Sequence, residues 1–157
     1  MSIEVIEGDL LHVDDVDALV NAWNRNIVPW WLLVPHGVSG AIKRAGGRAP
    51  FRELAHYGAI PLGGAVTTGA GRLPYKGIIH VAGLSMAWRA SEASVDAGTR
   101  AALAEARRHD FASLAFPLIG AGTGGLGPER SLDTMLGAIA DGGEGLRVVV
   151  VRYRQAR

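Results

Sequence analysis

The feature that most limits the possible folds is a glycine-rich segment that follows an apolar run. Five glycines occupy the eight positions from Gly120 to Gly127. The preceding residues, 114–119, are typical of a buried strand, whereas Pro128 and Glu129 suit the first turn of a helix. This arrangement predicts a cradle of backbone N–H groups that can hold a phosphate or diphosphate. The alternative is a plain tight turn between strand and helix.

The glycine spacing does not fit the common nucleotide folds. Gly120, Gly122 and Gly125 satisfy G-x-G-x-x-G, but a dinucleotide fingerprint belongs in the first βα unit, with an acidic residue about 20 positions later. Here the glycines fall in the last predicted βα unit, and the strand that follows (146–153) ends among arginines. No Gly-Lys-Ser/Thr follows the loop, so a P-loop is excluded. A nicotinamide dehydrogenase is therefore disfavoured.

The composition predicts one globular domain spanning residues 1–157. The chain is 48% hydrophobic and 20% charged, which is enough apolar content for a proper core. A net charge of only +1 gives no overall field to attract nucleic acid. The absence of cysteine excludes disulfides, thiolate zinc sites and a cysteine nucleophile. The five histidines form no pair at helical spacing, so we expect neither a metal nor a cofactor.

The chain also lacks a recognisable targeting or membrane signal. Residues 1–5 have neither the basic start nor the apolar run of a signal peptide. The longest apolar run, 27–35, is far too short to cross a bilayer. We therefore expect a cytoplasmic protein with no membrane partner, monomeric by default.

The alternation of apolar and helical segments predicts an α/β fold. Strands are expected near residues 3–6, 18–20, 64–69, 77–83, 114–119 and 146–153. Helices are expected after Ser39 as an N-cap, after Pro50, from Ser91 onwards and after Pro128. The strand runs are continuous, which favours a mixed, mostly parallel sheet of about six strands between two helical layers.

In such a sheet, ligands bind beyond the carboxyl ends of the strands. Asp9, Asn21, Asn24 and the glycine loop 120–127 all follow predicted strands, so we expect them to meet at one rim. Asp9 could accept a hydrogen bond from an adenine amine, or it is an ordinary turn residue. The amide of Asn24 could contact a ribose diol, or it caps a turn.

The remaining candidates lie in or near an unusual loop. Residues 25–37 contain two prolines, which argue against a regular helix or a central strand there. The tandem Trp30 and Trp31 could form a lid over a base or sugar, a dimer contact or part of the core. Of the histidines, His80 is expected in the core and His36 is the candidate site residue. No G-x-S-x-G motif supports a serine hydrolase.

Taken in chain order, these motifs resemble those of the macrodomains, the ADP-ribose-binding family, over nearly the whole chain. Residues 8–10 (Gly-Asp-Leu) are similar to G-D-I, and residues 16–24 to V-D-A-I-V-N-A-A-N. Residues 37–47 resemble G-V-D-G-A-I-H-R-A-A-G, residues 61–83 the P-x-G-x-A-x-x-T-x-G segment, and residues 117–125 P-x-I-S-T-G-x-x-G. The resemblance implies a three-layer α/β/α fold and these ligand-binding residues: Asp9, Leu10, Asn21, Asn24, Gly37, Val38, Gly120, Ala121, Gly122, Thr123, Gly124, Gly125 and Tyr153.

Two departures concern catalysis. Ser39 stands where many hydrolytic macrodomains have an aspartate, and a hydroxyl cannot serve as a carboxylate base at neutral pH. The loop from Asn24 to Gly37 is longer than in those enzymes and carries the two tryptophans and His36. The resemblance then implies a water held between the diphosphate and the anomeric carbon, with Asn24 orienting the ribose and His36 or Ser39 positioning the water.

The resemblance implies ADP-ribose and ADP-ribosylated proteins as partners. The leading expectation is an enzyme that hydrolyses ADP-ribosyl groups from proteins, most readily from acidic residues through an ester. A non-catalytic ADP-ribose reader is favoured by Ser39, whereas a chain consisting of this one domain favours an enzyme. Deacetylation of O-acetyl-ADP-ribose would use the same site and cut a different bond.

Overall fold

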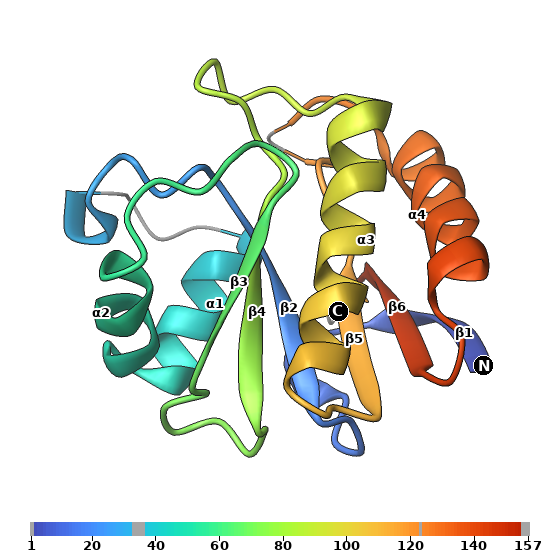
Figure 1. The fold of residues 1–157 in the computed structure, drawn as a ribbon, viewed down its shortest axis with the longest axis horizontal. Helices are drawn as coiled ribbons and strands as arrows, with labels where there is room; N and C mark the ends of the chain where they lie inside the picture. The colour runs from blue at the N-terminus through green and yellow to red at the C-terminus, as the bar shows by residue number, and fades with distance from the viewer. Residues whose placement is uncertain (1, 33–36, 123, 155–157) are drawn as a thin grey trace.

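The fold is built on a six-stranded sheet in the order β1-β6-β5-β2-β4-β3 (Figure 1). The computed structural model describes residues 2–32, 37–122 and 124–154. Five strands run parallel, and β3 at the edge pairs antiparallel with β4. The strands are β1 (Ser2–Gly8), β2 (Ala18–Trp23), β3 (Ala65–Thr68), β4 (Gly77–Ala82), β5 (Ser113–Pro117) and β6 (Arg147–Tyr153).

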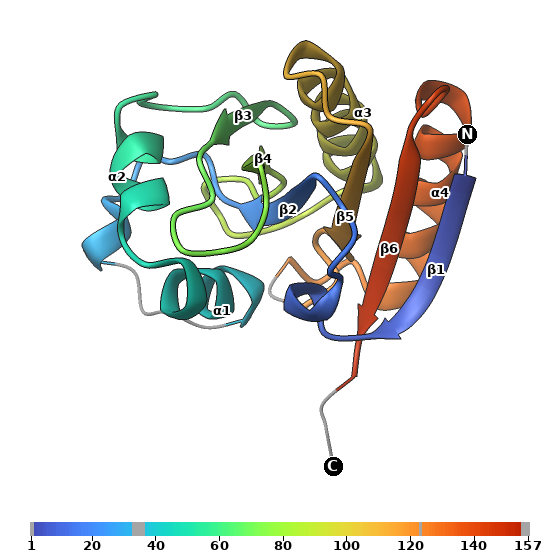
Figure 2. The same cartoon turned by 90° about the horizontal axis from the view of Figure 1, so that it is seen from below.

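Helices cover both faces of this sheet, as Figure 2 shows for α3 on one side and α1 on the other. The α-helices are α1 (Gly37–Gly46), α2 (Ala49–Ala55), α3 (Glu92–Arg108) and α4 (Pro128–Gly142), with short 3₁₀ helices η1 (Leu10–His12) and η2 (Trp30–Leu32). The valines of β6 contribute side chains to the cores on both faces of the sheet. Val148 and Val150 pack in the core beneath α3 and α4, and Val149 and Val151 pack in the core beneath η1. The predicted three-layer α/β/α fold is confirmed.

Local signals explain where the helices begin. Ser91 is the N-cap of α3, and its hydroxyl accepts from the Ser94 N–H while the Ser94 hydroxyl accepts from the Ser91 N–H. Proline stands in the first turn of both α2 and α4, where a missing N–H breaks no helical hydrogen bond. None of the helices in the described ranges is both long and apolar enough to cross a bilayer.

Two details of the prediction were wrong. Helix α1 begins at Gly37, so Ser39 is its third residue and not its N-cap. Strand β2 extends to Trp23, because it stays paired with β4 as far as Trp23 opposite Ala82. Asn21 therefore lies within a central strand, and does not follow it.

The extended β2 places Asn21 in a buried polar chain that crosses the core. Its Nδ2 lies 3.0 Å from Nδ1 of His80, the residue opposite it on β4. Nε2 of His80 lies 2.8 Å from the Thr68 hydroxyl, which in turn donates to the carbonyl of Gly69. Since Asn21 Nδ2 can only donate, Nδ1 of His80 accepts and the ring proton sits on Nε2. The predicted core position of His80 is confirmed, with both ring nitrogens satisfied.

Burial lowers the pKa of His80 from its ordinary value of 6.5 to about 3. In the unfolded chain this histidine binds a proton as the pH falls through about 6.5, whereas in the folded protein it does not until about pH 3. The contribution of His80 to stability is therefore complete above pH 6.5 and is lost progressively as the pH falls toward 3.

We expect the free energy of unfolding of wild type to fall between pH 6.5 and 5 with a slope of about 1 kcal/mol per pH unit, because one extra proton binds to the unfolded chain. Urea unfolding at several pH values measures this slope. In His80→Gln the slope should flatten, whatever the absolute stability of the variant. An equal slope in both proteins would show that His80 is not the group responsible.

Candidate functional site

The carboxyl ends of the five parallel strands form one rim. Gly8 at the end of β1 is opposite Tyr153 of β6, Pro117 of β5 is opposite Val151 of β6, and Trp23 ends β2. The loops that follow β1, β2 and β5 therefore leave the same edge of the sheet, at the top of Figure 1 for β2 and β5. The structure thus brings Asp9, Asn24 and the glycine loop to one rim, although they are far apart in sequence.

One end of the rim carries a carboxylate beside an aromatic ring. Oδ1 of Asp9 accepts from the Leu11 N–H at 2.9 Å and so caps η1. The side chain of Asp9 remains 41% exposed, and its Oδ2 lies 3.8 Å from Nδ1 of His12. Tyr153 is paired in register with Gly8 and is 72% exposed. Leu10, in contrast, is buried in the core beneath η1.

The glycine loop packs closely against the loop between β4 and α3. A Cβ at Gly120 would lie 2.4 Å from the Cβ of Ala90, and one at Gly124 would lie 2.8 Å from it. The Ala90 N–H donates to the Gly124 carbonyl at 3.0 Å. Gly120 also has a φ of +74°, which side chains rarely adopt. These two glycines are therefore required by the packing of the protein itself.

The middle of the same loop faces open space. Gly122 is exposed, and a Cβ there would have no neighbour within 4 Å. The backbone N–H groups of Gly120, Ala121, Gly122 and Gly124 have no hydrogen-bond acceptor among the described residues. Gly125 is bonded to the Gly122 carbonyl, which closes the loop. Thr123 lies outside the described residues. The loop thus presents several N–H donors and little bulk, as an anion requires.

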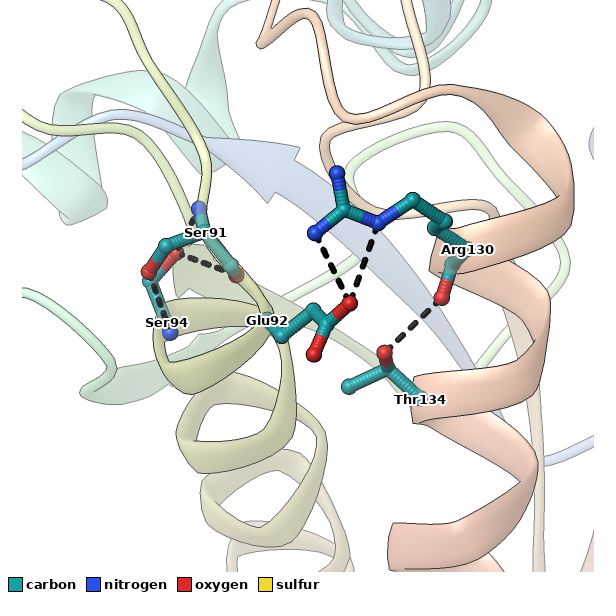
Figure 3. A network of polar contacts seen from close by, with 5 residues as sticks. All are labelled: Ser91, Glu92, Ser94, Arg130 and Thr134. Atoms are coloured by element: carbon teal, nitrogen blue, oxygen red, sulfur yellow. Dashed lines mark hydrogen bonds and ion pairs between the residues drawn. The ribbon is translucent and has the colours of Figure 1, made fainter.

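Two helix N-termini flank this loop and are tied together by an ion pair (Figure 3). Arg130 in the first turn of α4 donates from Nη2 at 2.8 Å and from Nε at 3.0 Å to one oxygen of Glu92, the first residue of α3. Both side chains are largely exposed, so the pair contributes under ~1 kcal/mol to stability. Both helices direct the positive end of their dipole toward the rim, which favours a bound anion.

At the other end of the rim, Asn24 presents a hydrogen-bond donor. Its Oδ1 accepts from the Asn26 N–H at 2.7 Å. Because a backbone N–H can only donate, the amide orientation is fixed and Nδ2 points away from this turn. Nδ2 has no partner in the part of the chain that the structure describes. Asn24 is thus a turn cap that is only 8% exposed, and its contact with a ribose stays a prediction.

The first turn of α1 reaches this same end of the rim. The Ser39 hydroxyl donates to Oδ1 of Asn21 at 2.8 Å and lies 3.2 Å from the carbonyl of Ala22 near the end of β2. The proton of Ser39 is therefore engaged within the protein. Gly37 and Val38 begin the helix, with Gly37 exposed and Val38 partly buried against the core. His36, the other predicted water-positioning residue, lies outside the described residues.

The sequence prediction named Asn21 as a ligand residue. Its side chain is fully buried, and both ends of its amide already bond to His80 and Ser39. Asn21 joins α1 to the buried polar chain. Its contact with a ligand stays a prediction. Among the described residues, no cluster of three metal-ligating side chains is present.

Sequence reasoning missed the loop between β4 and α3. This loop holds the glycine loop through Ala90 and carries an exposed Trp88 with a φ of +60°. Gly83 at its start lies so close to Ile119 that a Cβ would approach within 2.6 Å. The only signal in the sequence was Gly83 itself, the last residue of the segment 61–83.

Comparisons with known proteins agree with this geometry. The sequence model of the Macro domain matches residues 20–135. An uncharacterized protein of Aquifex aeolicus is 38% identical over 137 residues, which cover 87% of this chain and 79% of that protein.

Solved structures share the fold. A Trypanosoma brucei macrodomain in complex with ADP-ribose superimposes with a TM-score of 0.81 at 24% identity, over 98% of this chain and 64% of that one. An Oceanobacillus iheyensis macrodomain mutant with ADP-ribose gives a TM-score of 0.81 at 25% identity, over 99% and 86% of the two chains. The macrodomain of Mycobacterium tuberculosis DarG gives 0.75 at 26% identity, over 98% of both chains. The match to the family model over most of the chain, on a fold that these structures share, shows that this chain belongs to the Macro domain family.

Proposed function

We propose that this chain binds ADP-ribose along the rim and hydrolyses ADP-ribosyl groups from acidic side chains of modified proteins. The observation that carries the proposal is the order of groups along the rim. A carboxylate and an exposed aromatic ring lie at one end, free N–H donors in the middle and the Asn24 amide at the other end. Adenine, diphosphate and distal ribose need these groups in this order. Related macrodomains with ADP-ribose bound support the choice of ligand.

The diphosphate is proposed to lie on the glycine loop. The loop has no charged side chain between Gly120 and Gly127, so its contribution comes from backbone N–H groups and the two nearby helix dipoles. Such fixed dipoles bind an anion without the reorganisation that long charged side chains require. Gly122 has the space for a phosphate because no protein atom lies where its Cβ would be.

The distal ribose is proposed to lie between Asn24 and the start of α1. The Asn24 Nδ2 donates to a ribose hydroxyl and fixes the sugar relative to the diphosphate. A water held between the diphosphate and the anomeric carbon then attacks that carbon. The C–O bond to the ester breaks, and the carboxylate of the modified residue leaves as an anion. The water proton passes to a phosphate oxygen and from there to solvent.

Ser39 enters this scheme as a positioning residue. The Ser39 hydroxyl donates its hydrogen bond to Oδ1 of Asn21. The Ser39 oxygen can therefore accept a hydrogen bond from the water but cannot donate one to it. No carboxylate is available at this position to remove a proton. A leaving carboxylate needs little acid catalysis, which is why the ester linkage is the substrate that this site suits best.

The second candidate is a reader that binds ADP-ribose without chemistry. The specific observation in its favour is that Ser39 occupies the position of the missing carboxylate and is already hydrogen-bonded within the protein. Deacetylation of O-acetyl-ADP-ribose remains a third use of the same site. Incubation of the protein with a substrate modified on Glu or Asp, followed by measurement of released ADP-ribose, separates the first two. Tight calorimetric binding with no release would establish the reader.

Asn24 offers a prediction with a matched control. Asn24→Asp keeps the oxygen that accepts from the Asn26 N–H but loses the Nδ2 donor, whereas Asn24→Ala loses both. We expect about two- to tenfold weaker binding of ADP-ribose in Asn24→Ala, since one hydrogen bond contributes about 0.5–1.5 kcal/mol, and a larger loss in Asn24→Asp, whose charge also repels the diphosphate. Calorimetric titration measures the affinity. Only Asn24→Ala should also lower the melting temperature, and wild-type affinity in Asn24→Asp would remove Asn24 from the site.

Gly122 offers a second prediction. Gly122→Val adds a side chain where the protein has open space, so the melting temperature should stay close to that of wild type. ADP-ribose binding should fall by more than tenfold, because the valine occupies the volume assigned to the diphosphate. The control is Gly137→Ala, on α4, where a Cβ likewise has no neighbour within 4 Å. If Gly122→Val bound as well as Gly137→Ala, the diphosphate would have to lie elsewhere.

A further inference from the structure

A second surface combines exposed arginines with two tryptophans. A groove lined by η2, α1, α2 and the turn between β3 and β4 contains Trp30, Trp31, Arg44, Arg48, Arg52 and Arg72. We call these residues the basic groove. The whole chain has a net charge of only +1, so this positive charge is concentrated locally and offset by acidic residues elsewhere.

The arginines of the basic groove lack acidic partners in the part of the chain that the structure describes. Within the described residues, none of its four arginines has a carboxylate oxygen within 4.0 Å. Arg72 has a backbone partner, because its Nη2 donates a hydrogen bond to the Arg44 carbonyl near the end of α1 at 3.4 Å. The other three side chains are exposed and separated by four positions in sequence, at 44, 48 and 52. All three line the same groove, where their charges are open to negatively charged groups.

The tryptophans differ in their burial. Trp30 packs against Phe51 at a ring-centroid distance of 6.2 Å. The Lys43 Nζ lies 5.4 Å from the centroid of the Trp30 ring and donates to the Trp30 carbonyl at 3.2 Å. Burial among these rings lowers the pKa of Lys43. The next residue, Trp31, is 67% exposed although it stands on this well-held turn. Its indole is therefore a positioned aromatic surface open to solvent.

The arginine end of the basic groove lies away from the rim, whereas η2 belongs to the loop that leaves the rim after β2. Arg72 lies in the turn that joins β3 to β4, and β4 begins at the edge of the sheet opposite the rim. Figure 1 shows α2 and this turn well away from the loop between β5 and α4. Figure 2 shows α1, α2 and η2 grouped at the β3 side of the molecule. An occupant of the groove would extend from η2 toward the far edge of the sheet.

We propose that the basic groove binds single-stranded nucleic acid. Arg44, Arg48 and Arg52 contact successive phosphates, and an unpaired base stacks on the Trp31 indole. Cations beside an exposed aromatic ring are the combination that single-strand-binding surfaces use, since each base offers a π-face to the ring. An acidic peptide would match the arginines but leave the indole uncovered. The net charge of +1 gave no indication of a nucleic-acid partner, because it sums the basic and acidic parts of the surface.

The test is fluorescence anisotropy with a labelled oligothymidylate of about 12 nucleotides, a length within the range of single-strand sites. Trp31→Ala should weaken binding by about tenfold, the effect of losing one stacked base, and Trp31→Phe should retain most of it. The matched control is Trp88→Ala, which removes an exposed tryptophan outside the groove. Its affinity should equal that of wild type.

The arginines are tested through salt dependence. Replacing Arg44, Arg48 and Arg52 together by alanine should reduce the slope of log affinity against log salt concentration by about 2, since each phosphate contact in single strands contributes about 0.7. The triple lysine variant keeps the charges and should restore the slope. The Trp31 variants provide an independent answer if the triple alanine variant does not fold.

Three results would overturn the proposal. The first is absence of measurable binding to the wild-type protein at low salt. The second is displacement of the oligonucleotide by saturating ADP-ribose, which would place it in the rim. The third is equal competition by polyglutamate together with full affinity in Trp31→Ala, which would mean an acidic protein surface as the partner. Retained binding under saturating ADP-ribose, together with loss in both groups of variants, would support the basic groove as a separate site.

Discussion

Parallel pairing of the central strands is the constraint on which the rest of this structure depends. Because β1, β6, β5, β2 and β4 all run in one direction, the chain must return to the opposite end of the sheet between successive members of this set, as α3 does between β4 and β5 and α4 does between β5 and β6. The same direction brings every carboxyl end to one rim. A carboxylate, a glycine loop and an asparagine thus come together without any contact in sequence. The site is a consequence of the strand order.

The glycine loop shows two physical requirements in one segment. Gly120 and Gly124 leave room for Ala90, so they serve the packing of the loop between β4 and α3. Gly122 is exposed, and no protein atom packs where its Cβ would be. The first requirement holds the backbone still, and the second keeps its N–H groups accessible. A loop held by packing at Gly120 and Gly124 loses less conformational freedom when it binds an anion than a loop without such contacts.

The buried polar chain connects the core to the rim. His80 stays neutral because it is fully buried, and it is bonded at both nitrogens, to Asn21 and to Thr68. Oδ1 of Asn21 accepts from the Ser39 hydroxyl, so the buried polar chain continues to the first turn of α1. A serine in this position therefore has a structural partner. An aspartate there would place a negative charge beside the oxygen of the Asn21 amide, unless that amide turned over.

Much of the fold could be predicted from the sequence. The continuous valine run of β6, the Ser91 cap of α3 and the proline at the start of α4 are local signals, because propensity and patterning act between near neighbours. The same signals located Asp9, Asn24 and the glycines at strand ends. The end of β2 was missed because pairing with β4, and not local sequence, extends the strand to Trp23.

The sequence by itself determined the layers, the approximate places of the strands and the candidate ligand residues. Only the tertiary structure decided which atoms remain available. It left Nδ2 of Asn24 without a partner among the described residues, engaged Ser39 and Asn21 within the protein, and separated packing glycines from open ones. It also gathered Trp31 and the arginines of α1 and α2 on one surface, although the net charge is nearly zero. These outcomes depend on contacts between segments far apart in the chain, and neither composition nor local pattern contains them.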